Sequence, residues 1–208
     1  MSKIKICGLK TFEDIDAVNS YMPDYAGFVL VPGRTRDISH EHAAALKKRL
    51  SKDILAVGVF VNERRDVIAG LLERGVIDMA QLHGQETEED VRWLKERTGK
   101  TVIKAVSVKS ADDVERWRHS AADFLLADNG AGGSGQTFDW SLMFDITSDG
   151  LPPLFLAGGI NINNLEAALA LKPYAVDISG GVETDGHKNP VLIRDVINKV
   201  RRFDNDDR

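Results

Sequence analysis

The segment that decides the fold is Phe124–Trp140, which has the sequence FLLADNGAGGSGQTFDW. It begins as a short apolar strand that ends on one carboxylate, Asp128, and a glycine-rich stretch, Gly130–Gly135, follows at once. A strand that presents an acid and then opens into a flexible loop is typical of an active site. A single aspartate at a strand end is more often a turn residue, so the rest of the chain must decide between these interpretations.

The glycines of this segment also match a cofactor motif. Gly130, Gly132 and Gly135 satisfy the G-x-G-x-x-G pattern of dinucleotide-binding proteins. That pattern requires a long helix that starts at the third glycine and points its N-terminus at the pyrophosphate. Here Gln136–Trp140 intervenes, and only a short apolar segment follows before Pro152. The match therefore does not predict a dinucleotide cofactor.

Composition restricts the class of protein. With 208 residues, 43% hydrophobic and 28% charged, the chain is typical of a globular protein. The longest apolar run, Ile54–Val61, is too short to span a bilayer, and the absence of a signal-peptide segment predicts a cytoplasmic location. The single cysteine excludes an intramolecular disulfide and a cysteine-based zinc site. The net charge of −5 argues against a nucleic-acid partner.

Apolar, β-branched runs alternate with segments of helical spacing along the whole chain. We expect strands at Lys3–Gly8, Tyr25–Val31, Ile54–Val61, Asp78–Gly84, Thr101–Val108, Phe124–Asp128, Leu154–Ile160 and Ala175–Gly181. We expect helices at Phe12–Tyr21, Glu41–Leu50, Arg64–Leu72, Glu86–Arg97, Ala111–His119, Trp140–Ile146, Ile162–Leu171 and Pro190–Phe203. Alternating β and α units predict a parallel sheet. Their number, the chain length and the absence of a linker predict an α/β fold with one domain, a (β/α)8 TIM barrel over residues 1–208.

The first strand carries the sharpest chemical signal, since active sites of such barrels lie at the C-terminal ends of the strands. Ile4 and Ile6 share one face and suit the helix-facing side, which leaves Lys5 and Cys7 inside the barrel. A free cysteine is most often a small buried hydrophobe, but a nearby cation stabilises a thiolate. Cys7 is therefore a candidate base or nucleophile. Lys5 in turn needs a buried carboxylate, and strand parity makes Asp177 the first choice.

Other polar groups follow the ends of later strands. Arg34 and Arg36 are either solvated surface charges or a fork for a substrate carboxylate. His83 is either a general acid or a structural histidine. The loops after the last two strands are typical of phosphate binding through backbone amides. These loops contain Gly158 and Gly159, and then Ser179, Gly180 and Gly181.

Several motifs resemble, in order and spacing, the phosphoribosylanthranilate isomerase family over essentially the whole chain. They are K-I-C-G at 5–8, V-G-V-F-V-N at 57–62, Q-L-H-G at 81–84 and G-G-S-G-Q-T-F-D-W at 132–140, followed by both glycine pairs. The resemblance implies the Amadori rearrangement of N-(5-phosphoribosyl)anthranilate in tryptophan biosynthesis. It implies general acid–base catalysis with neither a cofactor nor a metal.

The resemblance also assigns roles to residues. The general base falls on Cys7, the general acid on Asp128 and the ligand of the anthranilate carboxylate on Arg36, with Arg34 left as an alternative. Asp177 falls near the sugar. The phosphate loops fall on Gly158 and Gly159 and on Ser179, Gly180 and Gly181. Both catalytic groups then need a pKa shifted toward neutrality, and we expect Lys5 to favour the thiolate of Cys7.

The chain departs from the family pattern at four places: Arg34-Thr35, where Ser-Pro is common; Asn129, where Thr or Ser is favoured; and Ala157 and Gly180, where Ser is common. These changes bear on individual hydroxyl contacts. An alternative is the histidine-pathway aminoaldose isomerase, which has Asp at the position of Cys7 and needs a second phosphate loop that no glycine pair offers here. The other alternative is a non-catalytic phosphate-binding barrel. In either case we expect a small phosphorylated ligand, no nucleic-acid or membrane partner, and a monomer or homodimer.

Overall fold

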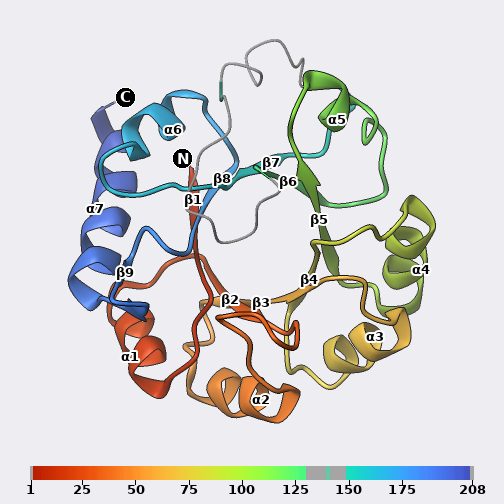
Figure 1. Cartoon of the computed structure of the whole chain (residues 1–208), viewed down its shortest axis with the longest axis horizontal. Helices are drawn as coiled ribbons and strands as arrows, with labels where there is room; N and C mark the ends of the chain where they lie inside the picture. The colour runs from red at the N-terminus through yellow and green to blue at the C-terminus, as the bar shows by residue number, and fades with distance from the viewer. Residues whose placement is uncertain (1, 130–139, 141–148, 207–208) are drawn as a thin grey trace.

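The computed structural model describes residues 2–129, 140 and 149–206 (Figure 1). Its parallel strands close into a barrel in sequence order, with the last strand paired to the first. The strands are β1 (Lys3–Cys7), β2 (Tyr25–Val29), β3 (Leu55–Phe60), β4 (Met79–Leu82), β5 (Thr101–Ser107), β6 (Phe124–Asp128), β7 (Leu154–Leu156) and β8 (Ala175–Ile178). The predicted (β/α)8 barrel is therefore confirmed.

Helices surround the barrel on its outer side, as Figure 1 shows. They are α1 (Phe12–Tyr21), α2 (His40–Arg49), α3 (Arg65–Glu73), α4 (Glu88–Thr98), α5 (Ala111–Glu115), α6 (Leu165–Ala170) and α7 (Pro190–Asp206). The glycine-rich stretch Gly130–Gly135 and the helix expected at Trp140–Ile146 lie outside the described residues, apart from Trp140 itself. No helix in the described part of the chain is long and apolar enough to cross a membrane.

Strand parity separates two apolar cores. Outward side chains such as Ile4 and Ile6 belong to the large core between the strands and the helices. Inward side chains such as Met79 and Phe155 form a smaller core inside the barrel. The predicted orientation of β1 is confirmed, because its isoleucines pack outward and Lys5 contacts groups inside the barrel.

Several strands end earlier than the sequence predicts. β2, β4 and β8 end at Val29, Leu82 and Ile178, and not at Val31, Gly84 and Gly181. β7 ends at Leu156 and not at Ile160, because Gly158 and Gly159 adopt φ values of 84° and 64° that a strand cannot hold. An unpredicted hairpin follows β8, formed by β9 (Glu183–Thr184) and β10 (His187–Lys188). Its turn residues, Asp185 and Gly186, have φ values of 51° and 77°, as a type I′ turn requires.

Candidate active site

The inner face of β1 carries a buried ion pair. Lys5 Nζ lies 2.7 Å from Asp177 Oδ2 and donates to Gln81 Oε1 at 2.8 Å. The Lys5 side chain is fully buried and that of Asp177 is 8% exposed. Burial alone lowers the pKa of Lys5, but Asp177 and Cys7 outweigh it and the pKa is raised. The Lys5–Asp177 pair predicted from strand parity is therefore confirmed.

Cys7 lies at the mouth of the barrel, the end where the C-termini of the strands meet. A Cβ at Gly27, its partner on β2, would lie 2.7 Å from Cys7 Sγ, so glycine leaves room for the thiol. Burial raises the pKa of Cys7, and Asp177 adds to this effect, while Lys5 and Lys188 oppose it. Within the Lys5–Asp177 pair the lysine has the larger effect and favours the thiolate, as expected. The pKa of Cys7 is nevertheless raised, because the desolvation of a buried thiolate outweighs the attraction of the lysine.

Asp128 ends β6 and faces the same interior. Its Oδ2 lies 3.1 Å from His83 Nε2, and its Oδ1 accepts from the backbone amide of Asn129 at 2.8 Å. Burial acts to raise the pKa of Asp128, but the hydrogen bond from His83 and the Asn129 amide outweigh it, and the pKa is lowered. The expected shift toward neutrality is therefore wrong for Asp128, because donors on both oxygens stabilise its ionised form.

Arg36 crosses the mouth beside the ends of β1 and β8. A Cβ on Gly8 would lie 2.5 Å from Arg36 Cδ, whereas Arg34 is exposed. Arg36 Nε and Nη2 both donate to the Glu183 carboxylate at 2.7 Å, and Lys188 Nζ contacts Glu183 Oε1 at 2.7 Å. Burial acts to raise the pKa of Glu183, but Arg36 and Lys188 lower it to about 2. The hairpin therefore places a carboxylate and a buried ammonium group beside Arg36.

The two glycine loops lie against each other. A Cβ on Gly181 would lie 2.0 Å from the carbonyl oxygen of Ile160, so only glycine permits this approach. An isolated bridge joins Asn161 to Gly181. The Ser179 hydroxyl donates to the carbonyl oxygen of Cys7 at 3.1 Å, which ties the second loop to β1.

The structure thus brings most of the sequence-predicted side chains to the mouth or the layer beneath it. Gln81 connects Lys5 to His83, Glu183 holds Arg36, and Lys188 contacts Glu183. Sequence reasoning assigned none of these three roles. The signal for the last two was the Asp-Gly turn. The signal for Gln81 was its parity with His83 on β4.

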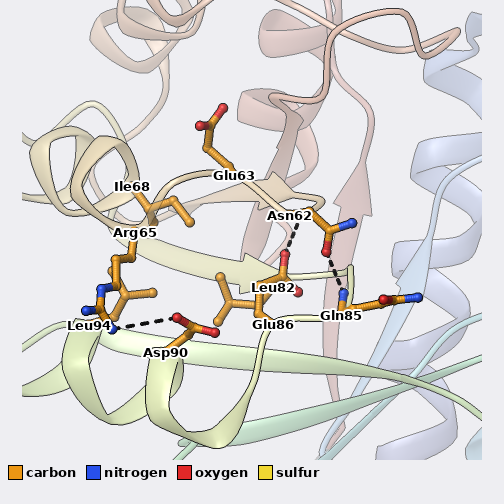
Figure 2. A pocket seen from close by; sticks show the side chains of 9 residues that line it. All are labelled: Asn62, Glu63, Arg65, Ile68, Leu82, Gln85, Glu86, Asp90 and Leu94. Carbon is orange, nitrogen blue, oxygen red and sulfur yellow. Dashed lines mark hydrogen bonds and ion pairs between the residues drawn. The ribbon is translucent and has the colours of Figure 1, made fainter.

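A cavity of about 220 Å³ lies elsewhere, against the outer side of the barrel wall between α3 and α4 (Figure 2). Its lining includes Asn62, Arg65, Glu86 and Asp90. Glu86 is paired with Lys104, and Asp90 binds the N-terminus of α4. These groups have structural partners, so the cavity is not the candidate active site.

A family model described as N-(5'-phosphoribosyl)anthranilate (PRA) isomerase matches residues 4–199. The chain belongs to this family. An N-(5'-phosphoribosyl)anthranilate isomerase of Acetivibrio thermocellus is 44% identical, and the match covers 98% of each chain. The isomerisation of phosphoribosylanthranilate, a step of tryptophan biosynthesis, is therefore the activity of this enzyme.

Solved structures of phosphoribosylanthranilate isomerases agree with this assignment. One, in complex with reduced 1-(o-carboxyphenylamino)-1-deoxyribulose 5-phosphate, is 35% identical with a TM-score of 0.84, over 97% of this chain and 100% of that one. Another, of monomers generated from the dimeric enzyme of Thermotoga maritima, is 35% identical with a TM-score of 0.85 and the same coverage.

Proposed function

We propose that Cys7 and Asp128 perform the Amadori rearrangement of N-(5'-phosphoribosyl)anthranilate as general base and general acid. Asp128 gives a proton to the ribose ring oxygen, the bond from that oxygen to C1′ breaks, and a Schiff base forms. Cys7 then takes the C2′ proton, and the resulting enolamine tautomerises to the ketone of 1-(2-carboxyphenylamino)-1-deoxyribulose 5-phosphate. The observation that carries this proposal is that both groups face the barrel interior at the mouth, from β1 and β6.

The substrate carboxylate is assigned to Arg36. Its guanidinium has five N–H donors, and Glu183 accepts from Nε and Nη2. The Nη1 side of the guanidinium therefore remains for the substrate carboxylate, and the contact with Glu183 fixes the plane of the guanidinium. Arg34 is exposed and serves as the matched control.

The phosphate is assigned to the loops after β7 and β8, around Gly158, Gly159, Ser179, Gly180 and Gly181. Close packing of these loops supports binding by backbone amides, and the absence of side chains at the glycines leaves the backbone accessible to a bulky anion. The Ser179 hydroxyl donates to the carbonyl oxygen of Cys7, so the backbone amide of Ser179, and not its side chain, is assigned to the phosphate.

Asp177 is assigned to a sugar hydroxyl. Its Oδ2 accepts from Lys5, but its Oδ1 is buried without a hydrogen-bond partner among the described residues. A buried carboxylate oxygen without a donor is costly, and a ligand hydroxyl at the mouth would supply that donor.

The protonation states have a kinetic consequence. The productive form needs a thiolate at Cys7 and a protonated Asp128, whereas the raised and lowered pKa values favour the opposite distribution. Each turnover also ends in this distribution, because Asp128 has given its proton to the substrate and Cys7 has taken one from it. We expect kcat/KM to hold a broad plateau, falling below the pKa of Asp128, where both groups carry a proton, and above that of Cys7, where neither does. A narrow optimum near neutrality would show that the two apparent pKa values lie close together, against the raised pKa of Cys7 and the lowered pKa of Asp128.

The direct test is the decrease in fluorescence of N-(5'-phosphoribosyl)anthranilate on addition of the purified protein. Cys7→Ala and Asp128→Asn should each lower kcat at least about a hundredfold with an unchanged fold. Arg36→Met should mainly raise KM, and Arg34→Met should do less, since a remote carboxylate contact stabilises substrate and transition state alike. Near-wild-type turnover by Cys7→Ala or Asp128→Asn removes that residue from the mechanism.

Conversion of the histidine-pathway substrate at a comparable rate would add the alternative activity.

We further propose a cytoplasmic enzyme without a nucleic-acid or membrane partner, either monomeric or homodimeric. The relative from Thermotoga maritima is a dimeric enzyme, which supports the second state. Light scattering at several protein concentrations decides between them.

A further inference from the structure

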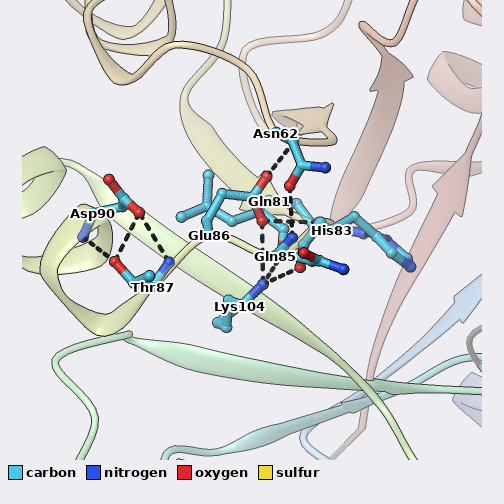
Figure 3. Close-up of polar contacts among 10 residues, drawn as sticks. Asn62, Gln81, His83, Gln85, Glu86, Thr87, Asp90 and Lys104 are labelled. Carbon is cyan, nitrogen blue, oxygen red and sulfur yellow. Dashed lines mark hydrogen bonds and ion pairs between the residues drawn. The ribbon is translucent and has the colours of Figure 1, made fainter.

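A continuous polar chain crosses the inside of the barrel from β8 to β6. Asp177 Oδ2 accepts from Lys5 Nζ at 2.7 Å, and Lys5 Nζ also donates to Gln81 Oε1 at 2.8 Å. Gln81 Nε2 lies 2.8 Å from His83 Nδ1, and His83 Nε2 lies 3.1 Å from Asp128 Oδ2. Figure 3 shows Gln81 and His83 side by side at this point of the chain.

Lys5 fixes the direction of every hydrogen bond in this chain. An ammonium group only donates, so the atom of Gln81 that faces Lys5 must be the amide oxygen. The amide nitrogen then faces His83 and must donate to Nδ1. Because a neutral imidazole carries one proton, that proton lies on Nε2 and is donated to Asp128 Oδ2.

We propose that Gln81 is a positioning residue for the acid step, which holds His83 in the Nε2–H tautomer so that His83 donates to Asp128. This inference rests on the proposed role of Asp128 as the general acid. For His83 to take a proton from Asp128, Nε2 must become an acceptor and the ring proton must move to Nδ1. Nδ1–H would then face the NH2 group of Gln81, which places two donors against each other. The proton that Asp128 carries is therefore reserved for the substrate.

Burial makes the orientation of the Gln81 amide rigid. Gln81 is 1% exposed and Lys5 is 0% exposed, so little solvent reaches an amide that turned over. A turned amide would point its NH2 group at the Lys5 ammonium, and the cost of such an unsatisfied buried contact is high. The ion pair with Asp177 keeps Lys5 charged and in place.

The first test uses the wild-type protein and needs no substrate. The nitrogen-15 resonances of the His83 ring, assigned by their loss in His83→Asn, should show a protonated Nε2 and an unprotonated Nδ1. A protonated Nδ1, alone or together with Nε2, overturns the proposal. Because activity is not measured, this result is independent of whether Asp128 proves to be the acid.

The second test reverses the polarity of the link. Gln81→Glu keeps the shape of the side chain, but its second oxygen accepts where the amide donated. His83 should then carry a proton on Nδ1, and kcat should fall about tenfold while KM changes less than about twofold. Gln81→Met removes both hydrogen bonds and should lower kcat without fixing either tautomer.

The matched control is Gln85→Glu, the same chemical change in the following loop at an exposed side chain. It should leave both the His83 resonances and kcat unchanged. An unprotonated Nδ1 in Gln81→Glu, or an unchanged kcat in both Gln81 variants, overturns the proposal. If a variant does not fold, the wild-type resonances still decide. If Asp128→Asn keeps its activity while the tautomer is as expected, the proposed function fails and the geometry of the chain stands.

Discussion

Two buried lysines lie on opposite sides of the barrel wall, each beside a carboxylate. Lys5 lies inside the barrel, 2.7 Å from Asp177, whereas Lys104 lies on the outer side of β5, 3.2 Å from Glu86. Burial acts to lower the pKa of both ammonium groups. In Lys5 it is outweighed, chiefly by Asp177, and the pKa is raised, whereas in Lys104 burial prevails over Glu86 and the pKa is lowered.

The remaining contacts of the two lysines differ in kind. Lys104 Nζ donates to the carbonyl oxygens of Leu82 at 3.3 Å and Gly84 at 2.8 Å, and Glu86 accepts from the amides of Asn62 and Gly84 (Figure 3). This pair therefore joins the loops that follow β3 and β4. Backbone carbonyl oxygens only accept hydrogen bonds, so Lys104 does not orient a further side chain through them.

Lys5, in contrast, donates to a side-chain amide that leads to His83 and Asp128. A buried ion pair is weak support for stability by itself. The comparison indicates that its role depends on its other partners. Side-chain partners extend the hydrogen-bond chain to Asp128, the proposed general acid, whereas backbone partners only connect loops of the fold.

The largest expected effect is that of Lys5→Met. It leaves Asp177 buried without its cation and should lower the free energy of unfolding by about 3–5 kcal/mol. It should also lower kcat, because Gln81 loses its orientation, and raise the pH at which Cys7 reacts with a thiol reagent, because Lys5 opposes the raised pKa of the thiol. Urea denaturation, steady-state kinetics and thiol labelling measure the three effects.

A second substitution separates stability from function inside the barrel. Lys5→Met combined with Asp177→Leu removes the uncompensated charge and should recover most of the stability, but not kcat. Lys52→Met, at an exposed lysine, is the control. Full activity in a stably folded Lys5→Met protein, with an unchanged thiol pH profile, would contradict the functional half of the comparison.

Lys104→Met is the counterpart on the outer side of the wall. Glu86 keeps two amide donors, so we expect a loss at the low end of the range for a broken buried pair, about 3 kcal/mol. We expect kcat within about twofold of wild type under conditions where the protein is folded. A fall in kcat as large as that of Lys5→Met, at equal folded fraction, would show that the outer ion pair also acts on the active site.

The sequence was sufficient to predict the barrel and the Lys5–Asp177 pair, because both follow from strand parity and the alternation of elements. It could not predict the pKa directions at Cys7 and Asp128, which depend on the balance between burial and the partners of each group: burial prevails at Cys7, and the hydrogen-bond donors prevail at Asp128. The bidentate contact of Arg36 with Glu183 was also out of reach, since the two residues lie 147 positions apart in the sequence. Local pattern does not encode such distances.

Lys188 combines a backbone partner with a side-chain partner. It is buried, donates to the carbonyl oxygen of Ser179 at 3.0 Å, and also contacts Glu183, whose carboxylate holds Arg36. Lys188→Met should cost less stability than either earlier variant, about 2 kcal/mol, because Glu183 keeps Arg36 as a partner. KM should rise about threefold or more, because Glu183, which holds Arg36, loses its contact with Lys188. An unchanged KM would place Lys188 with Lys104 as a purely structural group.

The smallest expected effect is the dependence of stability on acid pH that Glu183 contributes. Its folded-state pKa, about 2, lies below the ordinary value of 4.5, so the folded state binds its proton less readily than the unfolded chain does. The resulting stabilisation is fully present above about pH 5 and is lost as the pH falls from about 4.5 toward 2. Because other carboxylates titrate in the same window, the quantity to measure is the difference in unfolding free energy between wild type and Glu183→Gln. This difference should be constant from pH 7 to 5 and then shrink toward pH 2. A difference that is independent of pH would mean that Arg36 and Lys188 bind the neutral side chain as well as the charged one, and the contact would then resemble the backbone contacts of Lys104 more than the chain through Lys5.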